Sequence, residues 1–145
     1  MDLDRYPTFT DQDHLTYEFL SAGPKGVIKK VILFQEIQEN VFNLAFGDWN
    51  EEIQRIDDKV RSNNMDRNKV LATVAGVVVD FLSFYPGTYV FAMGESPVKS
   101  RLYQMSIALH WDQISKTVDV FGNNGSSWET FTKGRLYTGF LVTAK

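Results

Sequence analysis

The chain has 145 residues, of which 43% are hydrophobic and 23% charged, as expected for one globular domain spanning residues 1–145. It contains no cysteine, which excludes disulfides, thiolate metal ligands and thiol nucleophiles. The net charge of -3 argues against a uniformly basic surface, and no stretch approaches the roughly 20 apolar residues of a membrane span, so we expect a cytoplasmic protein.

The first part of the chain predicts an antiparallel meander. Residues 1–13 are rich in Asp and lack periodicity, so we interpret them as an acidic lead-in. Residues 15–22, 27–37 and 41–49 alternate in hydrophobicity or are rich in β-branched residues, which is typical of strands. Turn-forming residues separate them at 23–26 and 39–40. Such short connections favour antiparallel pairing.

The middle of the chain predicts two helices around one strand. Residues 50–64 are polar and are interpreted as a loop. From Val70 to Tyr85 apolar residues recur with a 3.6-residue period, and Pro86-Gly87 ends this helix. A short strand is predicted at 88–93. A second helix is predicted from Pro97 to about Ile114, with Ser96 as its N-cap.

The last part of the chain predicts strands at 117–121 and 136–142, with a hairpin turn at 123–125 and a helical turn at 128–131. The element order is therefore βββ-α-β-α-ββ. This order predicts an α+β fold, in which a largely antiparallel sheet of about six strands carries two helices on one face. The helical stripes expected in the core contain Val74, Val78, Phe81, Leu102, Met105 and Leu109.

Three stretches of the chain resemble a family of small bacterial proteins of unknown function. They are Ser62-Asn63-Asn64-Met65-Asp66-Arg67-Asn68-Lys69-Val70, Gly94-Glu95-Ser96-Pro97-Val98-Lys99-Ser100-Arg101-Leu102-Tyr103-Gln104, and Trp128-Glu129-Thr130-Phe131 followed by residues 137–142. The resemblance extends over nearly the whole chain. It implies a single bacterial domain, and it implies no activity, substrate or cofactor.

The start of the second predicted helix places cations where the helix field disfavours them. A helix N-terminus carries roughly half a positive charge and unpaired N–H groups. Lys99 and Arg101 lie in the first turn and a half, and Ser96 and Ser100 add hydroxyl groups. A bound anion would turn this unfavourable placement into a stabilising one. Alternatively, neighbouring carboxylates neutralise both cations.

The predicted topology brings a second group of polar residues to the same place. If the strand at 88–93 runs antiparallel to both helices, the two helix N-termini share one end of the sheet. The candidate anion site then comprises Ser96, Lys99, Ser100, Arg101, Arg67 and Lys69, with Asn64, Asp66 and Tyr103 in supporting positions. The structural alternative is that Asp66 simply pairs with Arg101.

Charge is distributed unevenly along the chain. Residues 1–95 hold 9 basic and 15 acidic residues, whereas residues 96–145 hold 6 basic and 3 acidic ones. The basic part also contains the aromatic residues Tyr103, Trp111, Trp128, Phe131 and Tyr137. Cations beside aromatic rings are typical of single-stranded nucleic-acid binding. The first hypothesis is therefore a non-enzymatic module that binds an anionic partner, either single-stranded nucleic acid or a phosphorylated ligand.

Two other hypotheses stay open. One is a protein–protein interaction module, either a homodimer or half of a two-gene bacterial pair. The other is a small hydrolase or nuclease acting through Asp66 with Arg67 and Arg101. No catalytic residue is assigned, because Ser96 lacks the glycine spacing of a nucleophile elbow and His110 lies too far along the same helix to serve it. We expect no metal, cofactor or membrane partner, since His14 and His110 are isolated.

Overall fold

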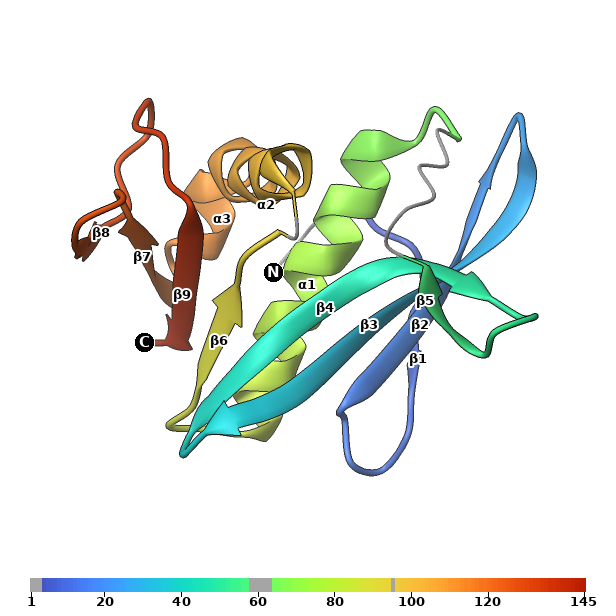
Figure 1. Cartoon of the computed structure of the whole chain (residues 1–145), viewed down its shortest axis with the longest axis horizontal. Coiled ribbons are helices and arrows are strands. Elements are labelled where there is room, and N and C mark those ends of the chain that lie inside the picture. Colours follow the sequence, from blue (N-terminus) through green and yellow to red (C-terminus); the bar gives the residue numbers. More distant parts are fainter. Residues whose placement is uncertain (1–3, 58–63, 95) are drawn as a thin grey trace.

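A computed structural model describes residues 4–57, 64–94 and 96–145. Its described elements, in chain order, are β1 (Phe9–Thr10), β2 (Thr16–Gly23), β3 (Gly26–Gln38), β4 (Val41–Asn50), β5 (Arg55–Asp57), α1 (Arg67–Phe84), β6 (Tyr89–Ala92), α2 (Pro97–Leu109), α3 (Trp111–Ile114), β7 (Val118–Asn123), β8 (Trp128–Thr130) and β9 (Gly139–Ala144). The strands form one sheet in the order β1-β2-β3-β4-β6-β9-β7-β8, with β5 also paired to β4. The helices pack on one face of this sheet (Figure 1).

The N-terminal meander is the part of the fold that the hydrophobic pattern predicts best. β2, β3 and β4 pair antiparallel, with Phe19 opposite Lys30 and Ile32 opposite Phe46. Because side chains alternate between the two faces of a strand, Phe19 and Phe46 both face the helices. The loop expected before the first helix also contains β5, and its residues 58–63 lie outside the described part of the chain.

The sheet contains a parallel seam between β4 and β6. These strands pair over only three positions, residues 41–43 with residues 89–91. Beyond Asn43, β4 diverges from β6, and α2 begins just after β6 at this widening gap (Figure 1). All the other strand pairs described are antiparallel. The seam matters for the site because the start of α2 faces the diverging part of β4.

The α+β class and the mostly antiparallel sheet are confirmed, but the predicted strand number and element order are wrong. The described sheet has nine strands, because β1, β5 and β8 are added to the expected six. Each added strand is two or three residues long, too short to show an alternating pattern. Residues 128–130 pair with β7 as a strand, whereas a helical turn was expected there. The second helix also breaks at His110, which separates α2 from α3.

The predicted core stripe is confirmed for α1 and is wrong for α2. Val74 and Phe81 are 4% and 0% exposed, whereas Leu109 is 54% exposed. The remaining predicted members, Val78, Leu102 and Met105, are half-buried. α2 instead buries Tyr103, Ser106 and Ile107. The Ser106 hydroxyl donates a hydrogen bond to the Leu71 carbonyl of α1 at 3.0 Å, so a polar residue occupies the central contact between the helices.

The described helices include none that is both long and apolar enough to cross a membrane.

Candidate functional site

The start of α2 is held by the serines that the sequence singled out. The Ser96 hydroxyl caps the helix by accepting a hydrogen bond from the Lys99 backbone N–H at 3.3 Å. The Ser100 hydroxyl accepts one from the Gly94 N–H at 3.0 Å. A Cβ on Gly94 would lie 2.3 Å from the Ser100 nitrogen, so only glycine permits this close approach of β6 to α2. Both serines thus fix the helix start.

Lys99 turns away from solvent toward the sheet. Its ammonium group donates a hydrogen bond to the backbone carbonyl of Phe46 in β4. It also lies 5.6 Å from the centroid of the Phe46 ring, within the range of a cation–π contact. Lys99 therefore links α2 to β4 across the gap where β4 and β6 diverge.

The start of α1 is tied to the β2–β3 hairpin. The Asp66 carboxylate accepts hydrogen bonds from the Tyr6 hydroxyl at 2.6 Å and the Ser21 hydroxyl at 2.5 Å. Asn64 is 3% exposed and donates a hydrogen bond to the Gly26 carbonyl at 2.9 Å. Asp66 forms no ion pair with Arg101 in the described structure, so the structural alternative for this carboxylate is not observed.

A row of stacked rings connects the two helix starts. Tyr6 stacks on Phe19 with centroids 5.8 Å apart, and Phe19 stacks on Phe46 with centroids 6.3 Å apart. The ammonium of Lys69 in α1 lies 4.5 Å from the Tyr6 ring, and Lys99 contacts the Phe46 ring. The structure thus brings Lys69 and Lys99 to one end of the sheet but separates them at the two ends of this ring stack.

A buried ion pair borders the same stack. The Lys30 ammonium lies 2.5 Å from the Asp48 carboxylate, and the two side chains are 9% and 12% exposed. Lys30 also lies 6.0 Å from the Phe46 centroid. Because Asp48 compensates its charge, Lys30 is excluded from the candidate site.

The two arginines of the predicted site remain on the surface. Arg67 and Arg101 are exposed, and neither has a carboxylate within ion-pair distance among the residues that the structure describes. Tyr103, expected to support the site, is 6% exposed and belongs to the core. The exposed cationic part of the site is therefore smaller than predicted.

The chain matches the description "Family of unknown function (DUF6934)" over residues 2–145. It belongs to this family. No curated protein and no solved structure matches the chain. The predicted resemblance to a family of unknown function is thus confirmed, and chemical arguments for a member of this family must come from its structure.

The aromatic residues expected to bind bases are mostly core residues in this DUF6934 chain. Tyr103, Phe131 and Tyr137 are 5–6% exposed, and Trp111 packs against the same core. Trp128 alone of the five predicted residues is clearly exposed, at 42%. These five aromatic residues therefore do not form one exposed surface on which bases could stack.

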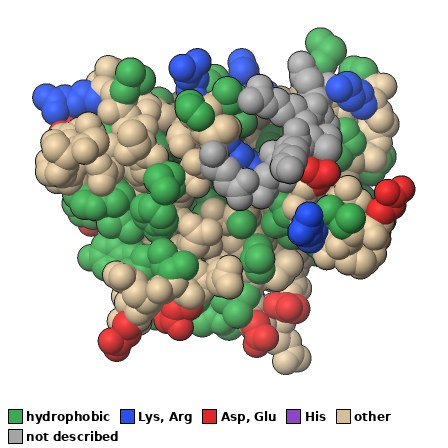
Figure 2. Space-filling view, in the orientation of Figure 1, with side chains coloured by type: hydrophobic (Ala, Val, Ile, Leu, Met, Phe, Trp, Pro, Cys, Tyr) green, Lys and Arg blue, Asp and Glu red, His purple; other side chains and the backbone are tan. Residues whose placement is uncertain are grey.

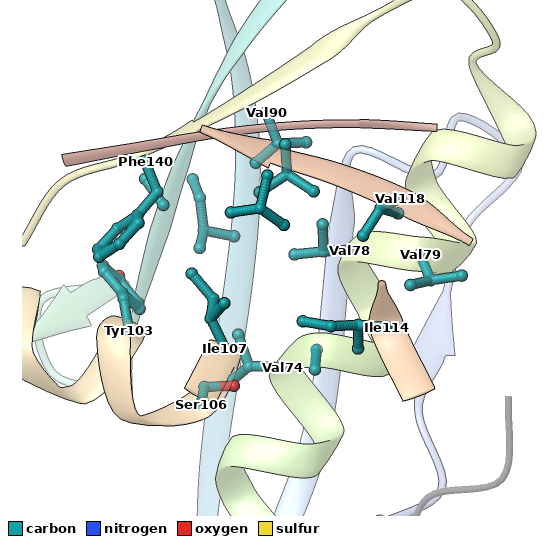
Figure 3. Close-up of a pocket in the computed structure, with 15 residues that line it drawn as sticks. Val74, Val78, Val79, Val90, Tyr103, Ser106, Ile107, Ile114, Val118 and Phe140 are labelled. Carbon is teal, nitrogen blue, oxygen red and sulfur yellow. The ribbon is translucent and has the colours of Figure 1, made fainter. Parts of the chain in front are cut away.

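The core contains a small apolar cavity of about 50 Å³ between the helices and the sheet (Figure 3). Side chains of α1, α2, α3 and the inner face of the sheet line it, among them Val74, Val78, Val90, Ile107, Val118 and Phe140. The polar groups at its wall are Tyr103 and Ser106, and the Ser106 hydroxyl is already bonded to α1. The described lining thus suits apolar atoms and offers no carboxylate or imidazole for acid–base chemistry.

Sequence reasoning missed three residues that build the site: Tyr6, Ser21 and Phe46. Tyr6 lies in the acidic lead-in, where no periodicity signals burial, yet it is 9% exposed. The alternation in β2 and β4 predicts that Ser21 and Phe46 share a face with their neighbours, but not which helix they meet. Their roles depend on contacts between segments distant in sequence.

Proposed function

We propose that this chain is a non-enzymatic binding module, and that its ligand is an anion of phosphate-like chemistry bound where α1 and α2 begin. One observation carries the proposal. The first turns of both helices contain no acidic residue beyond Asp66, the N-cap of α1, whereas Arg67, Lys69, Lys99 and Arg101 lie within their first two turns. Helix N-termini and cations both favour an anion at this end of the sheet.

The hydrogen bonds around the site support the proposal. The Asp66 Oδ2 accepts hydrogen bonds from two hydroxyl groups, and the described ion pairs include none between Asp66 and Arg101. Arg67 and Arg101 are exposed, and a guanidinium can contact two phosphate oxygens at once. In this proposal the two arginines contact the ligand, while Lys69 and Lys99 add positive potential from their fixed positions on the ring stack.

A phosphorylated small ligand is favoured over single-stranded nucleic acid. Binding of single strands combines cations with exposed rings on which successive bases stack. Most of the rings that would serve here lie in the core. A hydrolase mechanism through Asp66 ranks below binding in this proposal, because two protein hydroxyls already hold its Oδ2 in a structural role at the start of α1.

Thermal unfolding of the wild-type protein tests the proposal directly. Melts are compared in chloride, inorganic phosphate and pyrophosphate at matched ionic strength, and with a short oligonucleotide. We expect pyrophosphate to raise the melting temperature most, with a shift that shrinks as sodium chloride is added. A melting temperature that no phosphate compound raises, even at low ionic strength, would contradict the proposal. If only the oligonucleotide raises the melting temperature, the ligand is single-stranded nucleic acid and not a small phosphorylated compound.

A second candidate function, a protein-interaction module, is favoured by a separate feature. The face of the sheet opposite the helices carries large apolar side chains that no described helix covers.

A further inference from the structure

The uncovered face of the sheet carries an apolar patch over β6, β9, β7 and β8. Six large side chains form it, and we call them the outer patch: Tyr89, Phe91, Met93, Phe121, Trp128 and Leu141. Strand register places them together, because Phe91 and Phe121 both pair with Leu141 from opposite sides. The ring of Trp128 packs edge-on against Phe91, with centroids 6.2 Å apart.

The outer patch departs from the pattern of a solvent-facing sheet. An antiparallel sheet with one wet face usually alternates apolar residues inward with polar residues outward. Here β6 and β9 are apolar on both faces, since Val90 and Phe140 are fully buried on the inner side. Tyr89, Met93 and Trp128 are 39%, 51% and 42% exposed.

Little charge interrupts this surface. Among the outward-facing residues of β6, β7, β8 and β9, Asp119 is the charged one. Figure 2 shows hydrophobic side chains gathered over β6 and β9. Contiguous apolar surface of this kind marks an interface.

We propose that the outer patch binds the same patch of a second copy of this chain. Charge at the two ends of the molecule favours this occupant. Figure 2 shows acidic side chains at the end with the β3–β4 turn and the β1–β2 loop, and basic ones at the end where the helices begin. Glu39 in the β3–β4 turn belongs to the acidic end, whereas Lys133 lies in the loop that leads into β9 at the other end. Arg135 in the same loop is paired with Glu129 at 2.9 Å and is not counted.

The charges become complementary if the two copies are related by a two-fold axis that lies midway between their sheets, parallel to both sheets and perpendicular to the strands. Two copies then meet face to face with their strands reversed, as two packed sheets about 10 Å apart. The acidic end of each copy lies over the basic end of the other. The nearly uncharged patch between the ends faces itself without like-charge repulsion.

The size of the face sets the expected affinity. Six neighbouring strands from β3 to β8, about 4.8 Å apart and roughly five residues long, cover roughly 500 Å² of flat area per copy. Two copies bury about 1,000 Å², which is the lower limit for a specific interface. An interface at this limit is typical of a dimer that forms reversibly, and the experiment below covers dissociation constants in the micromolar range.

Sedimentation velocity from about 5 to 500 µM protein tests the interface, because a micromolar dimer dissociates within this range. We expect the wild type to shift from monomer to dimer. The double variant Tyr89→Lys, Trp128→Lys changes two exposed side chains of the patch and should stay monomeric. The matched control Ile53→Lys, Leu109→Lys changes two apolar residues that are 46% and 54% exposed outside the proposed interface, and it should dimerise as the wild type does. A wild type that stays monomeric throughout, or a control that loses the dimer equally, overturns the proposal.

A charge reversal tests the orientation of the two copies. The variant Glu39→Lys places a cation over the basic end of the partner copy, so its dissociation constant should rise severalfold at low salt and approach the wild-type value as salt is added. An unchanged dissociation constant overturns the reversed-strand arrangement. Pyrophosphate shifts are measured on the patch variant as well. They should persist, because the outer patch and the helix starts lie on different faces.

Discussion

The ammonium of Lys99 in α2 donates a hydrogen bond to the backbone carbonyl of Phe46 in β4. A cation in the first turn of a helix is unfavourable in the helix field. The carbonyl and the Phe46 ring offset this effect, because both present negative potential to the ammonium. One of the two misplaced cations in the sequence thus has a structural role, while Arg101 remains exposed.

Replacing Lys99 should therefore destabilise the protein. We expect Lys99→Met to lower the free energy of unfolding by about 1–2 kcal/mol, because it keeps the aliphatic chain but removes a charge-assisted hydrogen bond. Arg101→Met on the same helix is the matched control, and it should change stability by less than about 0.5 kcal/mol. Urea unfolding measures both. Equal losses would show that the Lys99 contact with β4 contributes nothing specific.

The second prediction concerns which residues of α1 and α2 are buried. Phe81→Ala should cost about 3–5 kcal/mol, because its ring is fully buried and stacks on Phe34 with centroids 4.0 Å apart. Leu109→Ala, in the stripe of α2 that proved exposed, should cost less than about 0.5 kcal/mol. Chemical denaturation of both variants checks the pair. A large loss of unfolding free energy in Leu109→Ala would show that Leu109 is buried, as the sequence pattern of α2 predicted.

These helices show where sequence patterns determine structure and where they do not. In α1 the periodic apolar face meets a sheet, so Val74 and Phe81 are buried as predicted. In α2 the buried face contains Tyr103, Ser106 and Ile107 instead of the predicted stripe, and the Ser106 hydroxyl bonds to the Leu71 carbonyl of α1. The alternating hydrophobic pattern predicts the long strands. The short strand β5 has no such pattern and forms by pairing with β4. The buried face of α2 and the formation of β5 therefore depend on tertiary contacts, which the local sequence pattern does not contain.

Alkaline pH should weaken the contribution of Tyr17. Burial raises the pKa of the Tyr17 phenol, and its hydrogen bond to Asp80 raises that pKa further. The folded phenol thus stays neutral while the unfolded one ionises above its ordinary pKa of 10.0, so stability falls as pH rises past that value. Tyr17→Phe should be less stable than wild type at neutral pH, and the difference should narrow above pH 10. Melts across this range measure it, and a constant difference would contradict the prediction.

The turn between β7 and β8 depends on a left-handed glycine. Gly125 has φ of +103°, so Gly125→Ala should destabilise by about 1–2 kcal/mol through backbone strain alone, since its Cβ would meet open space. Gly139→Ala is the matched control. Its φ lies outside the left-handed range and its Cβ would make ordinary contacts from 3.6 Å, so it should be neutral or slightly stabilising. Equal effects in thermal melts would rule out the turn conformation as the cause.

The sequence predicts where the two helix starts lie, but it does not predict the contacts of their side chains. Helix signals and the strand between them predict that the two helix starts lie at one end of the sheet, and the ring stack connects Lys69 of α1 with Lys99 of α2. Their separate contacts were not predictable, because the rings that hold the lysines come from segments distant in sequence. Tyr6 carries no local signal of its position between Lys69 and Phe19.

The central claim is that exposed arginines at the two helix starts bind a phosphate-like anion. Its most direct test is the pyrophosphate-induced shift in melting temperature of Arg67→Ala, Arg101→Ala, compared with Lys116→Ala, Lys145→Ala, which removes the same charge from exposed sites away from the helix starts. We expect the arginine variant to lose the shift while keeping or slightly gaining stability without ligand, because two cations leave the positive helix ends. The lysine variant should keep the shift. Equal responses of the two variants to pyrophosphate would contradict the claim.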